Sequence, residues 1–440
     1  MAQGGNQMKR RAFFSYFGVA AVAAMAFETQ AGTVDGALQS LTDAIVDGQV
    51  NLGVRYRYEH VTQDRPASIL HHANAQTVRT NLGWRTGLFH GFSAYAEVEN
   101  VSVVGDEDYN NTYNGEAAYP VVADPDGTEV NQAYLSWQGV AGNLARYGRQ
   151  VIAYDNHRFV GHVGWRQNQQ TFDGFSYQNT MLDGVTASYA YIYNANRIFG
   201  EDTPNKAFGN ISDFQLDGHL INLQWTPNAT TTLTGYAYLL DFDDFDAEST
   251  ATYGLRATGA VPLPQLGIDG AALLYTAEYA HQTDYADNAG DFGLGYGLAE
   301  LGVRLFGVTA KAGYERLEGG EMGGTRALQT PLATLHAFNG WTDRFLRTPA
   351  DGLEDRYVLA TGVLPGCGIN WLVRYDDFSA EASSEDYGSE WGVQLTKTFA
   401  KHYTVGVKYA DYDTDAPALL AGRADTTDTA KGWFWLQMSL

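Results

Sequence analysis

The last ten residues of the chain, KGWFWLQMSL (431–440), alternate between large apolar side chains and a second, mixed set. The first set is Phe434, Leu436, Met438 and Leu440, and the second is Trp433, Trp435, Gln437 and Ser439. Because successive side chains of a strand point to opposite faces, the alternation predicts a β-strand with one apolar face. Soluble sandwiches and barrels also hide one face of their strands, so the alternation alone does not identify a membrane protein.

Similar stretches recur along the whole chain. We count eighteen of them, an even number, as bacterial single-chain membrane barrels require. The stretches are 50–59, 76–88, 92–102, 132–137, 143–152, 170–178, 184–194, 217–226, 231–240, 251–260, 270–281, 295–305, 307–316, 355–362, 368–377, 389–399, 402–411 and 431–440.

The connections between these stretches alternate in length. After even-numbered stretches they are brief, namely 90–91, 227–230, Phe306, 365–366 and 400–401. After most odd-numbered stretches they are long, polar and acidic, namely 103–129, 195–216, 241–250, 282–294, 317–354, 378–388 and 412–430. Membrane barrels have short turns at one rim and long loops at the other. The sequence therefore predicts an all-β protein, a single closed antiparallel transmembrane β-barrel of about eighteen strands, with its long acidic loops outside the cell.

Composition agrees with this fold and excludes some partners. The chain has 28 Lys+Arg against 51 Asp+Glu, a formal charge of -23, and 28 Tyr, 21 Phe, 9 Trp and 49 Gly. Aromatic girdles are typical of membrane barrels. Binding of nucleic acid needs clustered basic charge, so no nucleic-acid partner is expected. The single Cys367 forms no intrachain disulfide and has no metal-site spacing.

The N-terminus predicts export. Lys9, Arg10 and Arg11 form a basic region, residues 12–27 are almost wholly apolar or small, and residues 29–31 offer a cleavage site. The apolar run is short for a helical span of about 20 residues. Without helical spans, an exported membrane protein has to be a barrel, because only helices and closed barrels satisfy their backbone in lipid. The expected organisation is a signal peptide (1–31), a short periplasmic segment (32–47) and a barrel in the Gram-negative outer membrane (48–440).

The polar faces of the predicted strands carry more basic than acidic residues. A charged side chain facing lipid costs about 2–4 kcal/mol at the bilayer midplane for Arg or Lys, so these charges are expected to face the lumen. The basic set is Arg55, Arg57, Arg79, Arg85, Arg256, Arg304, Lys311, Arg374 and Lys408, with Arg146 or Arg149 as further candidates. The acidic set is Glu97, Glu99, Glu278, Glu300, Glu315 and Asp376. Two interpretations stay open: ion pairs that brace a wide barrel, and a net-positive constriction that attracts anions.

The opposite faces of the same strands are apolar and are expected to contact outer-membrane lipid and lipopolysaccharide. Their members include Val50, Leu52, Val54, Leu82, Val405, Val407, Leu436 and Met438.

Two long segments resemble a known family. The first comprises YGRQ (147–150) and YDNHRFVGHVGWRQNQQTFDG (154–174), and the second is QTPLATLHAFNGWTDRFLRTPADGLED (329–355). Both are similar to the bacterial alginate-export outer-membrane porin family, and the similarity extends over about residues 48–440. The resemblance implies a single eighteen-stranded barrel whose arginine-lined lumen passes an anionic polysaccharide, alginate-like, or anionic oligosaccharides outward. It adds Arg149, Arg158 and Arg166 to the expected pore lining, with Arg344 as a weaker candidate.

The resemblance does not by itself identify the solute, because one porin fold hosts many solutes. A general diffusion porin for small solutes is therefore the alternative, and periplasmic secretion components are further expected partners. No metal and no cofactor are expected.

The second segment also predicts a short helix. Thr330 can cap it with Pro331 at the first position, where a missing N–H costs nothing. Leu332, Leu335 and Phe338 then share one face at helical spacing. Such a helix either narrows the pore from a long loop or packs across the rim.

An outer-membrane enzyme is the main alternative class, but the sequence does not favour it. Hydrolytic chemistry needs a nucleophile beside an oriented base, and neither a Gly-x-Ser-x-Gly elbow nor a His-Glu-x-x-His zinc motif is present. The acidic run 241–248 lacks the EF-hand pattern for calcium. The chain is therefore not expected to be an enzyme.

Overall fold

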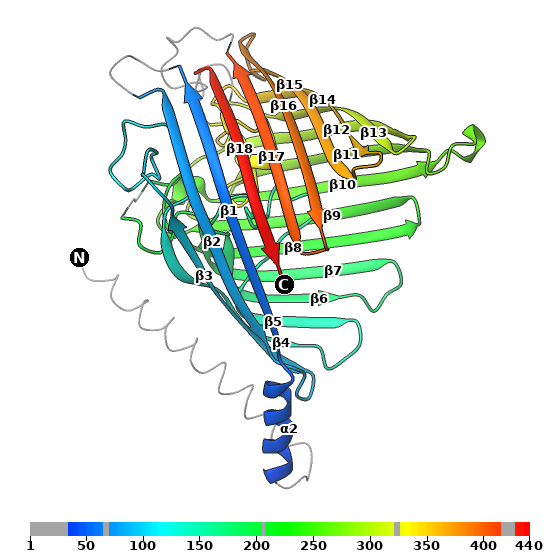
Figure 1. The fold of residues 1–440 in the computed structure, drawn as a ribbon. Helices are drawn as coiled ribbons and strands as arrows, with labels where there is room; N and C mark the ends of the chain where they lie inside the picture. Colours follow the sequence, from blue (N-terminus) through cyan, green and yellow to red (C-terminus); the bar gives the residue numbers. More distant parts are fainter. Residues whose placement is uncertain (1–33, 65–69, 205–206, 321–325, 415–426) are drawn as a thin grey trace.

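The computed structural model describes residues 34–64, 70–204, 207–320, 326–414 and 427–440. The predicted signal peptide lies outside the described residues. The described part is built almost entirely of β-strands, and α2 (Val34–Val46) precedes the first of them (Figure 1).

Eighteen strands follow in chain order, each overlapping a stretch predicted from the alternation. They are β1 (Gln49–Gln63), β2 (His72–Arg85), β3 (Phe92–Val103), β4 (Gly127–Trp137), β5 (Asn143–Gln150), β6 (Thr171–Asn179), β7 (Val185–Asn196), β8 (Asp213–Asn228), β9 (Thr231–Phe242), β10 (Thr250–Pro262), β11 (Ala272–Asp284), β12 (Gly293–Leu305), β13 (Val308–Leu317), β14 (Leu353–Leu364), β15 (Ile369–Ser379), β16 (Asp386–Phe399), β17 (Tyr403–Asp413) and β18 (Thr429–Ser439).

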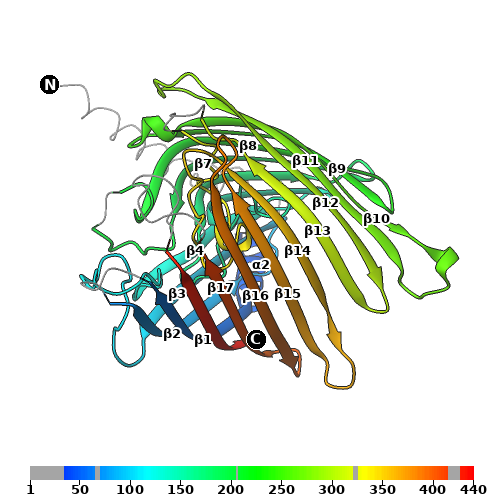
Figure 2. The same ribbon diagram turned by 90° about the horizontal axis from the view of Figure 1, so that it is seen from above.

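These strands form one closed antiparallel barrel. Each strand pairs with its neighbours in the chain, and β1 also pairs with β18, where Val54 lies opposite Met438. Closure leaves no strand edge unpaired, which is what lipid demands of a spanning sheet. The view from above shows the strands surrounding an interior that loops enter (Figure 2). The predicted fold class and strand number are therefore confirmed.

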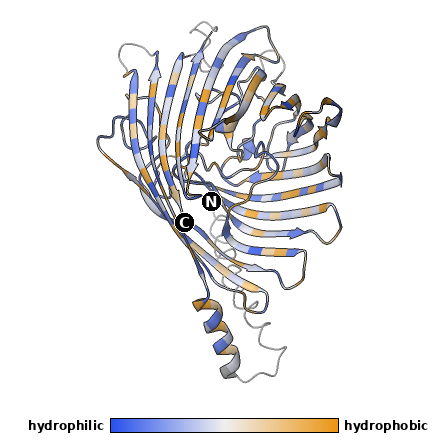
Figure 3. Ribbon diagram, turned by 45° about the vertical axis from the view of Figure 1, so that its right-hand side comes forward, coloured by the Kyte–Doolittle hydropathy of each residue, from blue (hydrophilic) through white to orange (hydrophobic). Residues whose placement is uncertain are grey.

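The pairing register separates an inner from an outer face of the wall. Hydrophobic and hydrophilic residues alternate along the strands (Figure 3). Leu52 pairs with Leu82 and Val407 pairs with Phe434, and these residues share the face that includes Val50, which is 64% exposed. The face opposite contacts the loops inside the barrel, so the eight residues expected to face lipid lie on the outer face.

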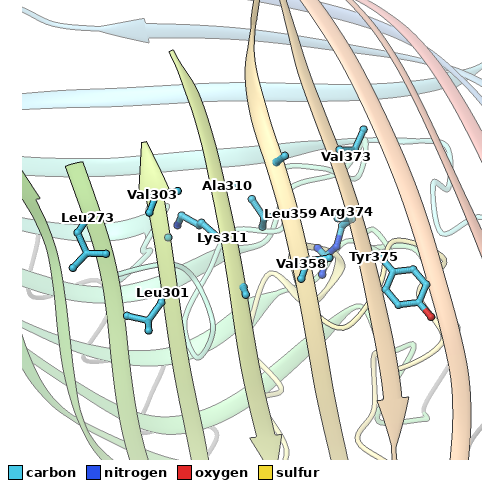
Figure 4. Close-up of a pocket in the computed structure, with 13 residues that line it drawn as sticks. Leu273, Leu301, Val303, Ala310, Lys311, Val358, Leu359, Val373, Arg374 and Tyr375 are labelled. Atoms are coloured by element: carbon cyan, nitrogen blue, oxygen red, sulfur yellow. The ribbon is translucent and has the colours of Figure 1, made fainter. Parts of the chain in front are cut away.

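A groove follows the outer face over β11 to β15 and is lined mainly by apolar and small side chains (Figure 4). Leu301, Val358 and Val373 are among its exposed members. Lys311 and Arg374, also labelled there, pair with Leu359 in the inner row of the same strands. This part of the wall thus shows the alternation of a membrane barrel, with apolar residues outside and charged residues inside.

Helical structure is sparse. Besides α2, the described chain has the 3-10 turns η1 (Asp246–Glu248), η2 (Pro264–Leu266) and η3 (Leu335–Ala337). None of the helices among the described residues is long and apolar enough to cross a membrane.

The helix predicted from Pro331 onward is wrong, because only η3 forms there. Within the segment the backbone makes only short turns, such as Ala333 N to Thr330 O at 3.1 Å, and its other backbone groups bond to another loop. Leu332 forms a parallel bridge with Val160, and the Leu332 carbonyl accepts a hydrogen bond from Gly161 N at 2.8 Å.

Candidate functional site

Two long loops enter the barrel and join each other across its interior. We call residues 151–170, between β5 and β6, the first inner loop, and residues 318–352, between β13 and β14, the second inner loop. Thr334 N donates to His157 O at 3.0 Å, and Gln170 Nε2 donates to Leu332 O at 3.1 Å. Together the described parts of the two loops form a partition inside the barrel. The segment 329–355 was expected either to narrow the pore or to pack across the rim. The structure places its loop part inside the barrel.

Arg158 connects both inner loops to the wall. Its Nε lies 2.8 Å from Glu315 of β13, and its Nη2 donates to Asn339 of the second inner loop at 3.0 Å. Asn339 Nδ2 in turn donates to Glu315 at 2.6 Å. Arg158 is only 2% exposed, so it holds the partition and does not line the solute path as expected from the resemblance.

Arg166 makes the second connection. Its two terminal nitrogens lie 3.0 Å from Glu59 of β1 and 2.9 Å from Asp343 of the second inner loop. Lys431 of β18 adds a 2.7 Å ion pair to Asp343. Burial alone raises the pKa of the Asp343 carboxyl, but Lys431 and the other cations around it hold that pKa well below its usual range. Asp343 is thus an ionised carboxylate that holds the second inner loop through Arg166, Lys431 and His336.

Lys408 holds the second inner loop against β17 and β18. Its Nζ lies 3.8 Å from the ring centre of Trp341 and 4.4 Å from that of Trp165, and it contacts His336 Nε2 at 2.8 Å. His336 Nδ1 lies 2.7 Å from Asp343. Burial, with Lys408 as the next cause, lowers the pKa of His336 to about 3, so this ring is neutral and accepts from Lys408. Lys408 is buried in an aromatic box, where cation–π contacts replace a carboxylate.

The first inner loop is attached to β1 by two arginines. Arg55 donates to Gln167 Oε1 at 2.9 Å and to Gly164 O at 3.0 Å. Arg57 pairs with Asp124 and donates to the Trp165 carbonyl, and it is 2% exposed. Both side chains point inward as predicted, but they bind the loop instead of facing open lumen.

Most other predicted lumen cations are paired with carboxylates along the wall. The pairs are Arg79–Glu99, Arg256–Glu278, Lys311–Glu300 at 2.8 Å and Arg374–Asp376 at 2.8 Å. These four cations therefore form ion pairs that brace the barrel wall. Each positive charge is largely cancelled by its neighbouring carboxylate.

The prediction that Arg149 faces the lumen is wrong. Arg149 pairs with Ala133, and Ala133 pairs with Ala96, whose side chain is exposed on the outer face. Arg149 instead forms an outer-face ion pair with Asp173 at 2.9 Å and a second with Glu201 at 2.7 Å. The alternative candidate Arg146 has the opposite parity and faces inward.

Three guanidinium groups on the inner wall have no carboxylate partner among the described residues. Arg85 donates to the Tyr134 hydroxyl at 3.0 Å, and Arg146 lies 5.2 Å from the same ring. Arg304 has only a 3.4 Å contact from its Nε to Thr309. All three lie near the short-turn end of their strands, which is the periplasmic end of a membrane barrel. Glu97 lies close by, bonded to neutral donors such as Tyr95 at 2.8 Å, so the cations outnumber it.

At the long-loop end, a cavity of about 520 Å³ lies above the partition. We call it the vestibule, and it is lined by both inner loops and by residues 197–199 and 208–210. Five of its lining residues are cationic, namely Arg166, Arg197, Arg344, Arg347 and Lys431. Among the described residues that line it, Asp343 is the single carboxylate. Two of these cations are also compensated from behind the lining, Arg166 by Glu59 at 3.0 Å and Arg347 by Glu248 at 2.8 Å. The described lining of the vestibule thus carries a moderate basic excess.

Sequence reasoning missed most of this compartment. Arg197 and Arg347 lie in loops, where no periodicity predicts a direction, and Arg344 was only a weak candidate. Lys431 has the same parity as the inward Trp433 and Trp435, so the alternation itself carried the signal that could have found it. No cluster of His, Cys, Asp or Glu among the described residues could hold a metal ion.

Comparison with known proteins agrees with this architecture. The family model for alginate export matches residues 49–315, more than half of the 440-residue chain. None of the curated protein sequences compared with the chain matches it.

Several solved barrels share the fold. OccAB4 of Acinetobacter baumannii is 14% identical with a TM-score of 0.70, and the alignment covers 90% of this chain and 98% of that one. OpdO of Pseudomonas aeruginosa is 14% identical with a TM-score of 0.65, covering 91% and 99%. OpdK of Pseudomonas aeruginosa, solved with vanillate, is 13% identical with a TM-score of 0.66, covering 90% and 99%. At this identity the structures establish the fold, and the family match establishes membership: the chain is an outer-membrane channel of the porin type that belongs to the alginate export family.

Proposed function

We propose that this channel passes anionic saccharides, either an alginate-like polysaccharide or shorter oligouronates, through a lumen that favours anions. The observation that carries the proposal is the group of three inward guanidinium groups without a carboxylate partner, Arg85, Arg146 and Arg304. A permeating carboxylate meets their charge directly, because no carboxylate of the described residues pairs with them.

The vestibule supports the same sign of selectivity. Five of its lining residues are cationic and one is a carboxylate. Arg166 and Arg347 also pair with Glu59 and Glu248 behind the lining, and the basic excess that remains favours the entry of an anion from the long-loop end. Membership of the alginate export family supports a carboxylated saccharide as the solute. The fold relative OpdK was solved with vanillate, also a carboxylate.

The test is the reversal potential of single channels in planar bilayers under a salt gradient. Wild-type protein should prefer chloride over potassium. The double change Arg85→Glu and Arg146→Glu should reduce that preference several-fold, because unit charges a few ångströms from the ion path contribute about 1 kcal/mol each even in water. The matched control is Arg149→Glu, the same change on the outer face, which should leave the preference unaltered. Cation preference in the wild type would overturn the proposal.

A second experiment separates a saccharide channel from a general diffusion porin. Oligouronates of increasing length are added and the blocking of current is compared with that by neutral oligosaccharides of equal length. The proposal expects longer blocks by the uronates, shortened in the Arg85→Glu and Arg146→Glu channel. Equal blocking by both sugars would favour the general porin.

A further inference from the structure

We propose that the vestibule is a binding site for a small amphipathic carboxylate, such as an aromatic monocarboxylic acid. This goes beyond the passage of saccharides, since it assigns to the external mouth a ligand of different chemistry from the proposed solute. The inference rests on one unsatisfied cation, on the apolar character of the surrounding surface and on the size of the cavity.

Arg197 is the cation. It follows β7 directly, and its guanidinium carbon lies 4.3 Å from the ring centre of Phe214 and 5.8 Å from that of Phe199. No carboxylate of the described residues pairs with it, and its Nε is buried without a hydrogen-bond partner. Burial lowers the pKa of Arg197 to about 10, so the group remains charged at neutral pH. A buried charge without a counter-ion is costly, and an anionic ligand would supply the missing partner.

The surface around Arg197 is largely apolar. Leu346 is 44% exposed and Val121 is 46% exposed, and both line the vestibule. Leu335, Phe208 and Pro331 are further lining residues. Apolar surface that faces water inside a cavity is stabilised by an apolar occupant, in proportion to the area that the occupant covers. A uronate ring, covered with hydroxyl groups, would leave these side chains uncompensated, whereas an aromatic ring would cover them.

The dimensions of the cavity agree with a small ligand. Pockets for small molecules span roughly 300–1,000 Å³, and the vestibule measures about 520 Å³. The partition forms its floor, where the lining residues Thr330 and Thr342 already bond to Arg158 and Glu390. The floor carboxylate Asp343 is already bound by Arg166 and Lys431, so it does not repel an anion as a free carboxylate would.

Binding is tested by titration calorimetry on the full-length protein in detergent with three probes. Benzoate carries both the charge and the ring, glucuronate carries the charge on a hydrophilic body, and benzyl alcohol carries the ring without the charge. Benzoate should bind at least about tenfold more tightly than benzyl alcohol, because only benzoate makes hydrogen bonds to the Arg197 guanidinium as a charged partner. It should also bind about tenfold more tightly than glucuronate, because only its ring covers the apolar lining.

Variants then assign the contributions. Arg197→Gln should weaken benzoate binding about tenfold, Arg197→Lys should restore part of it, and Leu346→Asn should weaken benzoate while leaving glucuronate unchanged. Arg149→Gln, on the outer face, is the control and should change nothing. Equal affinity for benzoate and glucuronate, or full benzoate affinity in Arg197→Gln, would overturn the proposal.

The outcome is independent of the proposed solute. The Arg85→Glu and Arg146→Glu channel should bind benzoate with wild-type affinity although its ion preference is reduced. If benzoate binds as expected while the wild-type channel prefers cations, the vestibular site stands and the saccharide channel fails. If the ion preference is as expected while benzoate does not bind, the anionic-saccharide channel stands and the vestibular site is disproved.

Discussion

At the scale of single residues, the role of each arginine is decided by its partner and by the face it occupies. Arg146 and Arg149 are three positions apart in one strand, yet the first faces the lumen without a carboxylate and the second pairs with Asp173 on the outer face. Arg158 is covered inside the partition. Basic charge in the sequence is thus divided among wall bracing, loop anchoring and the solute path.

The buried Arg158 gives the first prediction. Arg158→Ala should loosen both inner loops, because removing one partner of a buried ion pair leaves Glu315 uncompensated and typically costs about 3–5 kcal/mol. Hydrogen exchange of residues 326–345 should rise markedly. Arg149→Ala breaks only a partly exposed pair on the outer face, worth about 0–1 kcal/mol, and should leave that exchange unchanged. Equal protection in both variants would show that Arg158 does not hold the loops.

His336 gives a prediction of pH dependence. The groups around it are Lys408 from β17, Asp343 from its own loop and Arg166 from the first inner loop. Its pKa is about 3 in the folded protein and about 6.5 when unfolded. The unfolded state therefore binds the extra proton between these values, so the stabilisation is complete above about pH 6.5 and is lost progressively as pH falls towards 3.

Current fluctuations of single channels should consequently increase as the pH is lowered from 7 to 5. His336→Gln retains hydrogen-bonding groups but does not titrate in this range, so its fluctuations should not depend on pH over the same interval. A variant that responds to pH as strongly as the wild type would assign the effect to the carboxylates instead.

At the scale of elements, the conformation of a strand is set by its own sequence, whereas that of an inner loop is set by its contacts. A strand's inner and outer faces follow from its alternation, because the period of two is built into the backbone. The second inner loop has helical spacing in its sequence but forms only η3, since its backbone groups are satisfied by His157 and Gly161 of the first inner loop. A tertiary contact has overridden a local preference.

The partition can be tested by shortening one of its halves. Replacing residues 329–345 by a short glycine–serine linker should raise single-channel conductance several-fold, because the loop lies across the interior that ions must cross. The comparable control is replacement of residues 264–270, in the turn between β10 and β11 at the opposite rim, which should leave conductance close to wild type. Unchanged conductance after the first replacement would mean that ions do not pass at the partition.

The register of the wall gives a prediction for β17. A spin label at Val407 should be relaxed by oxygen dissolved in lipid, and a label at Val405 should behave in the same way, because both lie on the outer face. A label at Thr404 should be shielded from oxygen and accessible to aqueous reagents if the lumen is open at that height. Reversed accessibilities would mean that the strand is out of register by one residue.

At the scale of the whole molecule, the total charge and the charge that we propose for the ion path have opposite signs. The chain carries a formal charge of -23, while basic groups outnumber acidic ones among the described residues that line the vestibule. Surface charges more than about 8–10 Å from the ion path are screened at physiological salt. Neutralising Asp243, Asp244 and Asp246 together should therefore change the ion preference little at 0.15 M salt and noticeably at 0.01 M. A large change at physiological salt would place these loops at the conduction path.

The sequence by itself determined the barrel, its strand number and the facing of most strand residues, because alternation and loop length are local consequences of a closed sheet in lipid. It also marked the two segments that become the inner loops, through their resemblance to the alginate export family. Only the tertiary structure decided what those loops do. The pairing of Arg158 with Glu315, 157 residues away in the chain, and the box around Lys408 depend on segments brought together by barrel closure. Arg197 likewise lines the vestibule only because folding places it beside Phe214 at the edge of a cavity, where no carboxylate of the described residues pairs with it.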